Sequence, residues 1–333
     1  MTTLHTPPPV IAPERRPPTA LSRFLRGNEA GLIAVLAALW IVLGITSDPF
    51  LTHHNVANIL LDISQIGIVG VGMTMVIITS GIDVSVGSAL AVCAVLTGQS
   101  MSAGNPTVVS VLISVAAGLA AGLVNGLLIA YGRIHPIIVT FGTLNLFRFI
   151  SYQLTGGEWI TGLPSSLHGL GVGSLLGIPY AWLLTMALAA LAGLYLRYRP
   201  TGRHLYALGN NAETARLSGV RTTRRQVAVY TLTGLLAGVA ALVFIGRNGG
   251  VQTNVGNGFE LQVIAAVVLG GTSILGGKGT VLGTLLGALL VGTVRNALII
   301  VGVPALLEGL FLGLLIIVAV GVDVLRQRRR ATA

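Results

Sequence analysis

Apolar residues fill long runs along this chain, and short polar or glycine-rich links separate each run from the next. Most runs approach the roughly 20 residues that an α-helix needs to cross a bilayer. The pattern therefore predicts an all-α, polytopic membrane protein with about ten transmembrane helices. The predicted spans are residues 30–46, 59–79, 86–98, 107–131, 136–154, 176–196, 226–246, 261–275, 280–300 and 306–325.

The third predicted span is the shortest, and it is interpreted as either a complete helix or a broken, re-entrant one. Residues 1–28 are rich in proline and arginine and predict a flexible basic tail. The first apolar run begins late and no small-residue cleavage pattern follows it, which argues against a cleaved signal peptide. Residues 29–325 then form a single transmembrane domain, and residues 326–333 form a second basic tail.

Composition supports the same class of protein. The 333 residues are 53% hydrophobic and only 9% charged, whereas soluble domains carry about 25% charged residues. Mean hydropathy is +0.85. Glycine, with 45 residues, is abundant, as it is in membrane helices.

The net charge of +10 is distributed in a way that argues against nucleic-acid binding. Basic residues lie between apolar runs and at both ends, as expected of cytoplasmic loops. An even number of spans places both termini on one side. If that side is the cytoplasm, all but three of the 20 Lys and Arg residues are cytoplasmic, the exceptions being Arg148, Arg247 and Arg295.

The longest polar interruption is the cytoplasmic loop 197–225, which holds seven arginines and a single acid, Glu213. A short helix is predicted inside it, with Asn210 and Asn211 as candidate N-caps and Gly219 as the stop. Glu213 follows Asn210 by three residues, the spacing of a capping box. A capped polar helix between membrane spans indicates a docking element for another protein, because topology alone requires arginines but no caps.

Small residues recur at four-residue spacing in two predicted spans, which predicts close helix packing there. They are Gly118, Gly122 and Gly126, and Gly279, Gly283 and Gly287. The turns 79–88 and 272–280 resemble each other weakly, as internal repeats of transporters do.

No constellation for catalysis, metal binding or nucleotide binding is found in the sequence. The six histidines lie outside the predicted spans and form no metal-ligand pair with the single cysteine, Cys93. Gly277-Lys278 fails as a phosphate loop, because Thr272 stands where the first glycine belongs and Gly279 replaces the Ser or Thr. We therefore expect no catalytic residue, no metal and no cofactor bound by this chain.

Polar residues inside spans are costly in lipid and usually face a cavity or the protein interior. The candidates for a substrate pathway are Asp83, Asn125, Asn145, Arg148 and Asn296. Each has a structural alternative, since amides and ion pairs also serve helix packing and Asp83 could cap a helix. Asp62, Gln65, Arg295 and Glu308 also lie within or near spans and are ranked lower.

Four ordered blocks of sequence resemble the permease subunits of bacterial ABC importers for sugars, of the ribose/xylose/arabinose type. The blocks are residues 81–88, 138–144, 206–220 and 265–279, and the resemblance covers nearly the whole chain after residue 30. Residues 82–88, 93–96 and 155–164 look most like autoinducer-2 importer permeases and their rhamnose-type relatives. The proline-rich tail departs from the pattern.

The resemblance implies a multi-pass protein of the bacterial cytoplasmic (inner) membrane that translocates autoinducer-2 or a similar small sugar by alternating access. Rhamnose, ribose or another monosaccharide remains an alternative. Its implied partners are a pair of ABC ATPases that bind ATP and magnesium, a second permease subunit, alike or different, and an external solute-binding protein. The family's coupling element corresponds to residues 210–220, which include Asn210, Asn211, Glu213, Ala215, Arg216, Leu217 and Gly219.

A rival interpretation from another class is an ion-coupled carrier that works without an ATPase. Such a carrier would be expected to hold a proton- or sodium-binding carboxylate deep in the membrane. Asp62 and Glu308 lie near span ends, so the sequence gives this interpretation little support.

Overall fold

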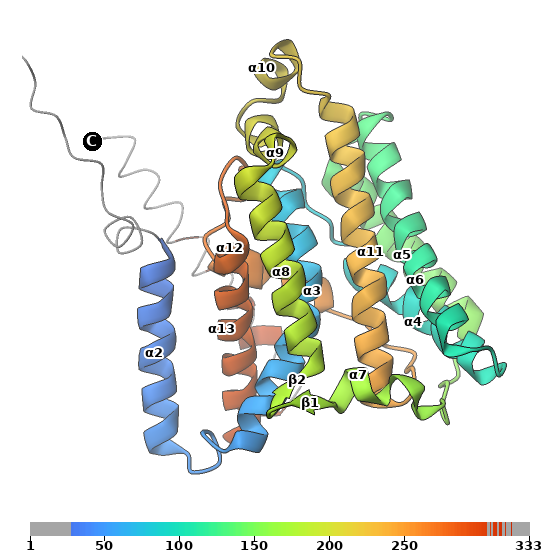
Figure 1. The fold of residues 1–333 in the computed structure, drawn as a ribbon, viewed down its shortest axis with the longest axis vertical. Coiled ribbons are helices and arrows are strands. Elements are labelled where there is room, and N and C mark those ends of the chain that lie inside the picture. Colours follow the sequence, from blue (N-terminus) through green and yellow to red (C-terminus); the bar gives the residue numbers. More distant parts are fainter. Residues whose placement is uncertain are drawn as a thin grey trace, which may run out of the picture.

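The computed structural model describes residues 28–304 and, beyond these, residues 307, 309–311, 313, 314, 317 and 321 (Figure 1). Among the described residues, seven helices are long and apolar enough to cross a membrane. They are α2 (Asn28–Thr46), α3 (His53–Ile78), α5 (Thr107–Ala130), α6 (Pro136–Thr155), α8 (Tyr180–Tyr198), α11 (Thr222–Asn248) and α13 (Val281–Ile300).

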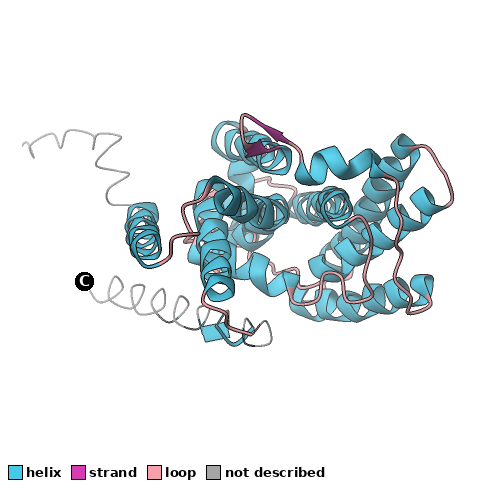
Figure 2. Cartoon of the chain, turned by 90° about the horizontal axis from the view of Figure 1, so that it is seen from below, coloured by secondary structure: helices cyan, strands magenta, loops and turns pink. Residues whose placement is uncertain are grey.

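Two shorter apolar helices complete the bundle, and smaller elements connect its members. The short helices are α4 (Val86–Ser102) and α12 (Phe259–Leu269). The connecting elements are η1 (Ser165–Leu167), α7 (His168–Val172), β1 (Ser174–Leu175), β2 (Ile178–Pro179), α9 (Pro200–Asn210) and α10 (Ala212–Leu217). Figure 2, in which the structure is seen along many of its helix axes, shows how little of the chain is strand.

Helix α3 forms the centre of the bundle and packs against α8, α11, α12 and α13. From Ile59 on, its residues are mostly buried, as expected for a membrane helix surrounded by other helices rather than lipid. Helix α2 lies at the edge and is mostly exposed (Figure 1). Its Trp40 Nε1 donates to Thr293 Oγ1 at 3.0 Å, which ties α2 to α13.

Glycines bring the backbones of α5 and α11 into contact. A Cβ at Gly122 would clash with the carbonyl oxygen of Tyr230, and one at Gly234 would clash with that of Gly118. Beside them, Ser114 Oγ donates to the carbonyl of Gly238 at 2.9 Å. The close packing predicted from the glycine spacing of the fourth span is therefore confirmed.

The predicted close packing of residues 279–287 is also confirmed for Gly283 and Gly287, which lie on α13. A Cβ at Gly283 would clash with the carbonyl of Gly270, and one at Gly287 with that of Ala266, so α13 packs backbone to backbone against the end of α12. Gly279 precedes the helix, in the turn.

The segment between α11 and α12 runs along the bundle without helical structure. Val251 pairs with Ile160 through two backbone hydrogen bonds, of 3.0 and 2.9 Å. Val251 also approaches Gly98 of α4, whereas Gly256 packs on Gly87 near the other end of that helix. Gly87 and Gly98 are about 16 Å apart along α4, because an α-helix rises 1.5 Å per residue. Irregular backbone at this depth is tolerated where protein or a water-filled cavity surrounds it.

The predicted spans 107–131, 136–154 and 280–300 agree with α5, α6 and α13 to within a residue or two. The third span is an unbroken helix, α4, so its interpretation as a broken helix is wrong; the irregular segment precedes α12 instead. The tenth span lies largely outside the described residues, as do the tail 326–333 and, except for its last residue, the tail 1–28.

Five predicted boundaries are wrong by four residues or more. Helix α4 ends at Ser102 rather than near residue 98, and α11 begins at Thr222 rather than near residue 226. The other three have a local reason. Helix α3 begins at His53 rather than near residue 59, because Thr52 caps it by accepting from Asn55 N at 3.4 Å. Helix α8 begins four residues later than expected, because a hairpin of β1 and β2 precedes it. Helix α12 ends at Leu269 rather than near residue 275, because two consecutive glycines follow it.

We expect Gly122→Ala to destabilise the bundle, because its methyl group would push α5 away from α11. Gly142→Ala is the matched control: Gly142 lies in α6 with no atom near its Cβ position, so alanine should be neutral or stabilising by up to about 1 kcal/mol. Thermal unfolding in detergent measures both. Equal melting temperatures for the two variants would contradict the packing described.

Candidate functional site

The first candidate site is the helical pair α9–α10, which projects from one end of the bundle (Figure 1). Helix α9 is firmly attached. Its Leu205 and Leu208 are buried, and a Cβ at Gly209 would clash with the carbonyl of Ile78 at the end of α3. Tyr206 donates its hydroxyl to the carbonyl of Gly279 at 3.0 Å. Burial raises the pKa of this hydroxyl, which therefore remains a donor.

Helix α10 is exposed except for Ala215, which is 4% exposed. Asn211 is its N-cap and accepts from Thr214 N at 2.9 Å. Gly219 adopts a φ of 83° just after the helix, a conformation that suits glycine. The predicted cap, stop and helix are thus confirmed. Asn210 is not the cap: it ends α9, so the predicted capping box does not form.

Glu213 pairs instead with Arg216 on the same helix, at 2.6 Å. The two hydrogen bonds from Arg216 hold the pKa of the Glu213 carboxyl below its ordinary value, and the same bonds raise the pKa of Arg216. This interaction is therefore present at neutral pH and is lost only as the pH falls through the lowered pKa of Glu213. Both side chains are more than half exposed, so the pair adds little stability.

Two of the five pathway candidates, Asp83 and Asn125, meet in one buried hydrogen-bond network. Asp83 Oδ1 accepts from the backbone N and the hydroxyl of Ser85, at 2.9 and 2.6 Å. Asn125 Nδ2 donates to the Ser85 hydroxyl at 2.8 Å, and its Oδ1 accepts from Thr143 at 2.7 Å. The network joins the turn before α4 to α5 and α6, as a packing role requires.

The other three candidates lie apart from one another. Asn145 is exposed on α6 and donates to its own helix at Phe141. Asn296 of α13 exchanges hydrogen bonds of 3.0 and 2.8 Å with Asn55 of α3. Arg148 donates from Nη1 to the carbonyl of Val255 at 2.5 Å and thereby holds the irregular segment, while Glu260 is the acid whose charge acts on it.

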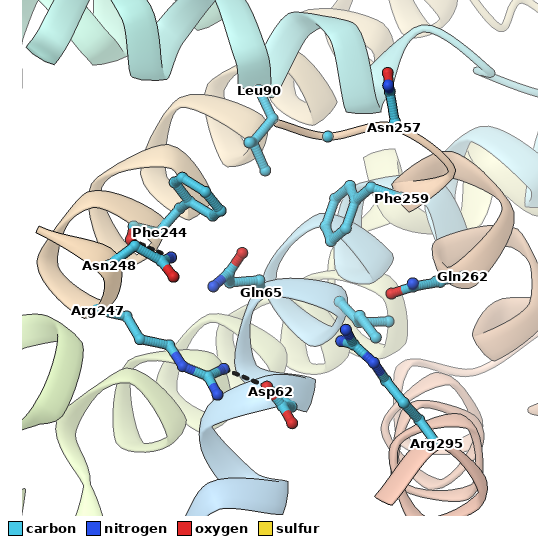
Figure 3. Close-up of a pocket in the computed structure, with 12 residues that line it drawn as sticks. Asp62, Gln65, Leu90, Phe244, Arg247, Asn248, Asn257, Phe259, Gln262 and Arg295 are labelled. Atoms are coloured by element: carbon cyan, nitrogen blue, oxygen red, sulfur yellow. Dashed lines mark hydrogen bonds and ion pairs between the residues drawn. The ribbon is translucent and has the colours of Figure 1, made fainter. Parts of the chain in front are cut away.

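A second candidate site is a cavity of about 280 Å³ between α3, α4, α11, α12 and α13 (Figure 3). None of the five pathway candidates lines it. Its lining residues are Asp62, Gln65, Ile66, Leu90, Phe244, Arg247, Asn248, Gly256, Asn257, Phe259, Gln262 and Arg295.

The polar groups of this cavity come from different helices and converge. Asp62 of α3 forms an ion pair with Arg247 of α11, and both side chains are about one quarter exposed, at 19% and 29%. Gln65 lies between the two sides of the cavity, and Gln262 and Arg295 point into it from α12 and α13 (Figure 3). In Figure 3 the rings of Phe244 and Phe259 lie between the charged side chains and Leu90.

Sequence reasoning ranked Asp62, Gln65 and Arg295 low and did not consider Gln262. The usable signal was the irregular, glycine- and asparagine-rich segment before α12, because broken membrane segments in transporters commonly lie beside the substrate. Residues 247–262 supply half of the lining residues of the cavity.

A bundle of membrane-length helices around a polar cavity is typical of an integral membrane protein. Comparison with known proteins specifies which kind. A family model described as branched-chain amino acid transport system / permease component matches residues 55–320, and the chain belongs to this permease family.

The relatives are import permeases. The ribose import permease protein RbsC of Bacillus subtilis (strain 168) is 40% identical over 299 residues, which cover 89% of this chain and 92% of the relative. The autoinducer 2 import system permease protein LsrC of Yersinia pseudotuberculosis is 37% identical, covering 89% and 84%. Its counterpart from Salmonella typhi is 36% identical, covering 89% and 85%. No solved structure matches the chain.

We expect Asp62→Asn and Arg247→Gln each to destabilise the protein by roughly 1–3 kcal/mol, because each leaves a half-buried charge without its partner. The double variant should cost less than the sum of the two. Thermal unfolding of the four proteins completes the cycle, and strictly additive effects would show that the pair contributes nothing.

We expect Arg148→Ala to lower both thermal stability and transport, because the Val255 carbonyl and Glu260 lose their cationic neighbour. Arg148→Lys should recover part of each, since it restores the charge but not the planar guanidinium. Unchanged uptake and unchanged melting in the alanine variant would remove Arg148 from the site.

Proposed function

We propose that the chain is the membrane-spanning permease subunit of an ATP-driven importer in the bacterial cytoplasmic (inner) membrane. Separate ATPase subunits bind ATP and magnesium, a second permease subunit completes the membrane part, and an external protein delivers the solute. The observation that carries the proposal is α10: a capped helix, exposed on all sides but one, on a firmly held base.

We assign the end of the bundle that carries α9 and α10 to the cytoplasm, because basic residues are concentrated there. The loop 197–225 holds seven of the 20 basic residues, and Arg133 and Lys278 lie in other links that reach the same end. Arginine and lysine accumulate in cytoplasmic loops. Both termini lie on this side if the protein has ten spans.

Helix α10 has the features of a ligand for a groove on the ATPase. Leu217 is 75% exposed and supplies an apolar anchor, while Glu213 and Arg216 supply charge beside it. A short helix with one apolar anchor and flanking charges fits the helix-in-groove mode of recognition. Closure of the ATPase pair would move α10, and α9 would pass that movement to α3 and α13.

The substrate in this proposal is autoinducer-2 or a similar small sugar, with ribose, rhamnose or another monosaccharide as alternatives. Its support is that the relatives named above are import permeases for ribose and for autoinducer 2. The two relatives differ by only a few per cent in identity to this chain, so identity does not choose between them.

We expect Leu217→Asp and Glu213→Ala each to abolish ATP-driven uptake while the protein still inserts and folds. Leu217→Asp should also lose co-purification with the ATPase. Leu176→Asp is the matched control, because Leu176 is 95% exposed in the β1–β2 hairpin, far from α10 (Figure 1).

The same reconstituted vesicles distinguish the importer from an ion-coupled carrier. ATP-dependent uptake that requires the ATPase supports the proposal. Uptake driven by an ion gradient in vesicles without ATPase or ATP would overturn it. Normal uptake by both α10 variants would leave an importer but show that α10 is not its docking element.

A further inference from the structure

The geometry points to the cavity of Figure 3 as a binding site for one uncharged, polyhydroxylated solute of monosaccharide size. The inference rests on the proposed transport function and specifies where, along the path, the solute is held. It assigns recognition to Asp62, Gln65 and Gln262, with Arg247 and Arg295 as further donors.

The lining supplies both kinds of hydrogen-bonding group that a polyol needs. A hydroxyl donates one hydrogen bond and accepts two, so several adjacent hydroxyls require donors and acceptors in alternation. The carboxylate of Asp62 only accepts, the guanidinium groups of Arg247 and Arg295 only donate, and the amides of Gln65 and Gln262 do both. These groups come from four helices and surround one space.

The same set disfavours charged solutes. Asp62, Arg247 and Arg295 are the charged lining residues and sum to +1, which disfavours a cationic solute, whereas an anionic solute would compete with Asp62 for Arg247. Either would disturb the Asp62–Arg247 ion pair, whose two charges already balance each other. A neutral solute can bond to the outer lone pairs and N–H groups of this pair while the pair stays intact.

The aromatic rings and the size of the cavity further restrict the class of solute that would fit. Phe244 and Phe259 offer apolar faces, against which the C–H face of a sugar ring can pack. About 280 Å³ is at the lower end of ligand pockets, which span roughly 300–1,000 Å³. The space suits a monosaccharide.

The position of the cavity also suits a transported solute. Its walls belong to α3, α12 and α13 on one side and to α4 and α11 on the other, and the Asp62–Arg247 pair joins the two sides. Rocking of one group of helices against the other would open or close the space.

Thiol labelling tests the site without relying on transport. Cys93 is the single cysteine and is buried, so an introduced cysteine is the reactive one. Asn248→Cys places a thiol at the exposed edge of the cavity, and Gln153→Cys places one on an exposed part of α6 that does not line it. A water-soluble methanethiosulfonate reagent is applied with d-ribose, autoinducer-2 or l-rhamnose, and with ribose 5-phosphate as an anionic control.

At ten times its apparent Kd, a neutral solute should slow labelling of Asn248→Cys about tenfold, because only about one cavity in eleven remains free. Labelling of Gln153→Cys should not change, and ribose 5-phosphate should protect neither. Absence of protection by every neutral solute, or equal protection of both cysteines, overturns the inference.

Transport variants provide the second measurement. Gln65→Leu and Gln262→Leu keep side-chain size but remove hydrogen bonds, so uptake at solute concentrations well below saturation should fall about tenfold in each variant. Solute binding by the external protein, which is a separate chain, should not change. Gln153→Leu is the matched control and should transport normally.

The two proposals fail in different ways. Protection of Asn248→Cys without ATP-dependent uptake keeps the binding site and refutes the importer. ATP-dependent uptake without protection, or with normal rates in both Gln→Leu variants, keeps the importer and refutes the binding site.

Discussion

Contact between helix backbones, made possible by glycine, is the constraint on which the rest of this structure depends. Lipid is as apolar as leucine, so hydrophobic burial does not drive one membrane helix against another, and close van der Waals packing must do so. Gly122 and Gly234 achieve this between α5 and α11, and Gly270 and Gly283 between α12 and α13. These contacts fix the positions of α11, α12 and α13, and all three helices contribute side chains to the wall of the polar cavity.

The same close contact connects α10 to the interior. Gly277 N, in the turn before α13, donates to the carbonyl of Ile78 at 2.9 Å. Ser80 Oγ, in the turn after α3, donates to the carbonyls of Gly209 and Leu275, at 3.0 and 2.9 Å. The turns 79–88 and 272–280, whose sequences resemble each other, therefore meet next to α9. A displacement of α9 must act on α3 and α13, and these two helices also contribute Asp62, Gln65 and Arg295 to the cavity.

The sequence predicted those parts of the fold that follow from local chemistry. Apolar run length located α5, α6 and α13, glycine spacing located the tight helix pairs, and Asn211 with Gly219 located α10. Prediction from the sequence failed for segments whose structure depends on tertiary contacts. Helix α9 was missed because its polar residues resemble those of a loop, whereas in the structure its Leu205 and Leu208 are buried and the helix packs against both α8 and α3. The irregular segment before α12 forms because Ile160 and Arg148 satisfy part of its backbone from elsewhere, and because Gly87 leaves room for its close approach to α4.

The same distinction explains why residue type inside a span could not identify the cavity. Asp62 lies within α3 and Asp83 follows its end, and the surroundings of the two carboxylates differ. Asp83 is 2% exposed and lies in a network with Ser85 and Asn125 that uses neighbouring donors. Asp62 has one ion-pair partner and faces an open space. A buried polar group with its hydrogen bonds made holds helices together, whereas one with bonding capacity directed into a cavity can hold a solute. Only the packing of distant segments determines which of the two a given residue becomes.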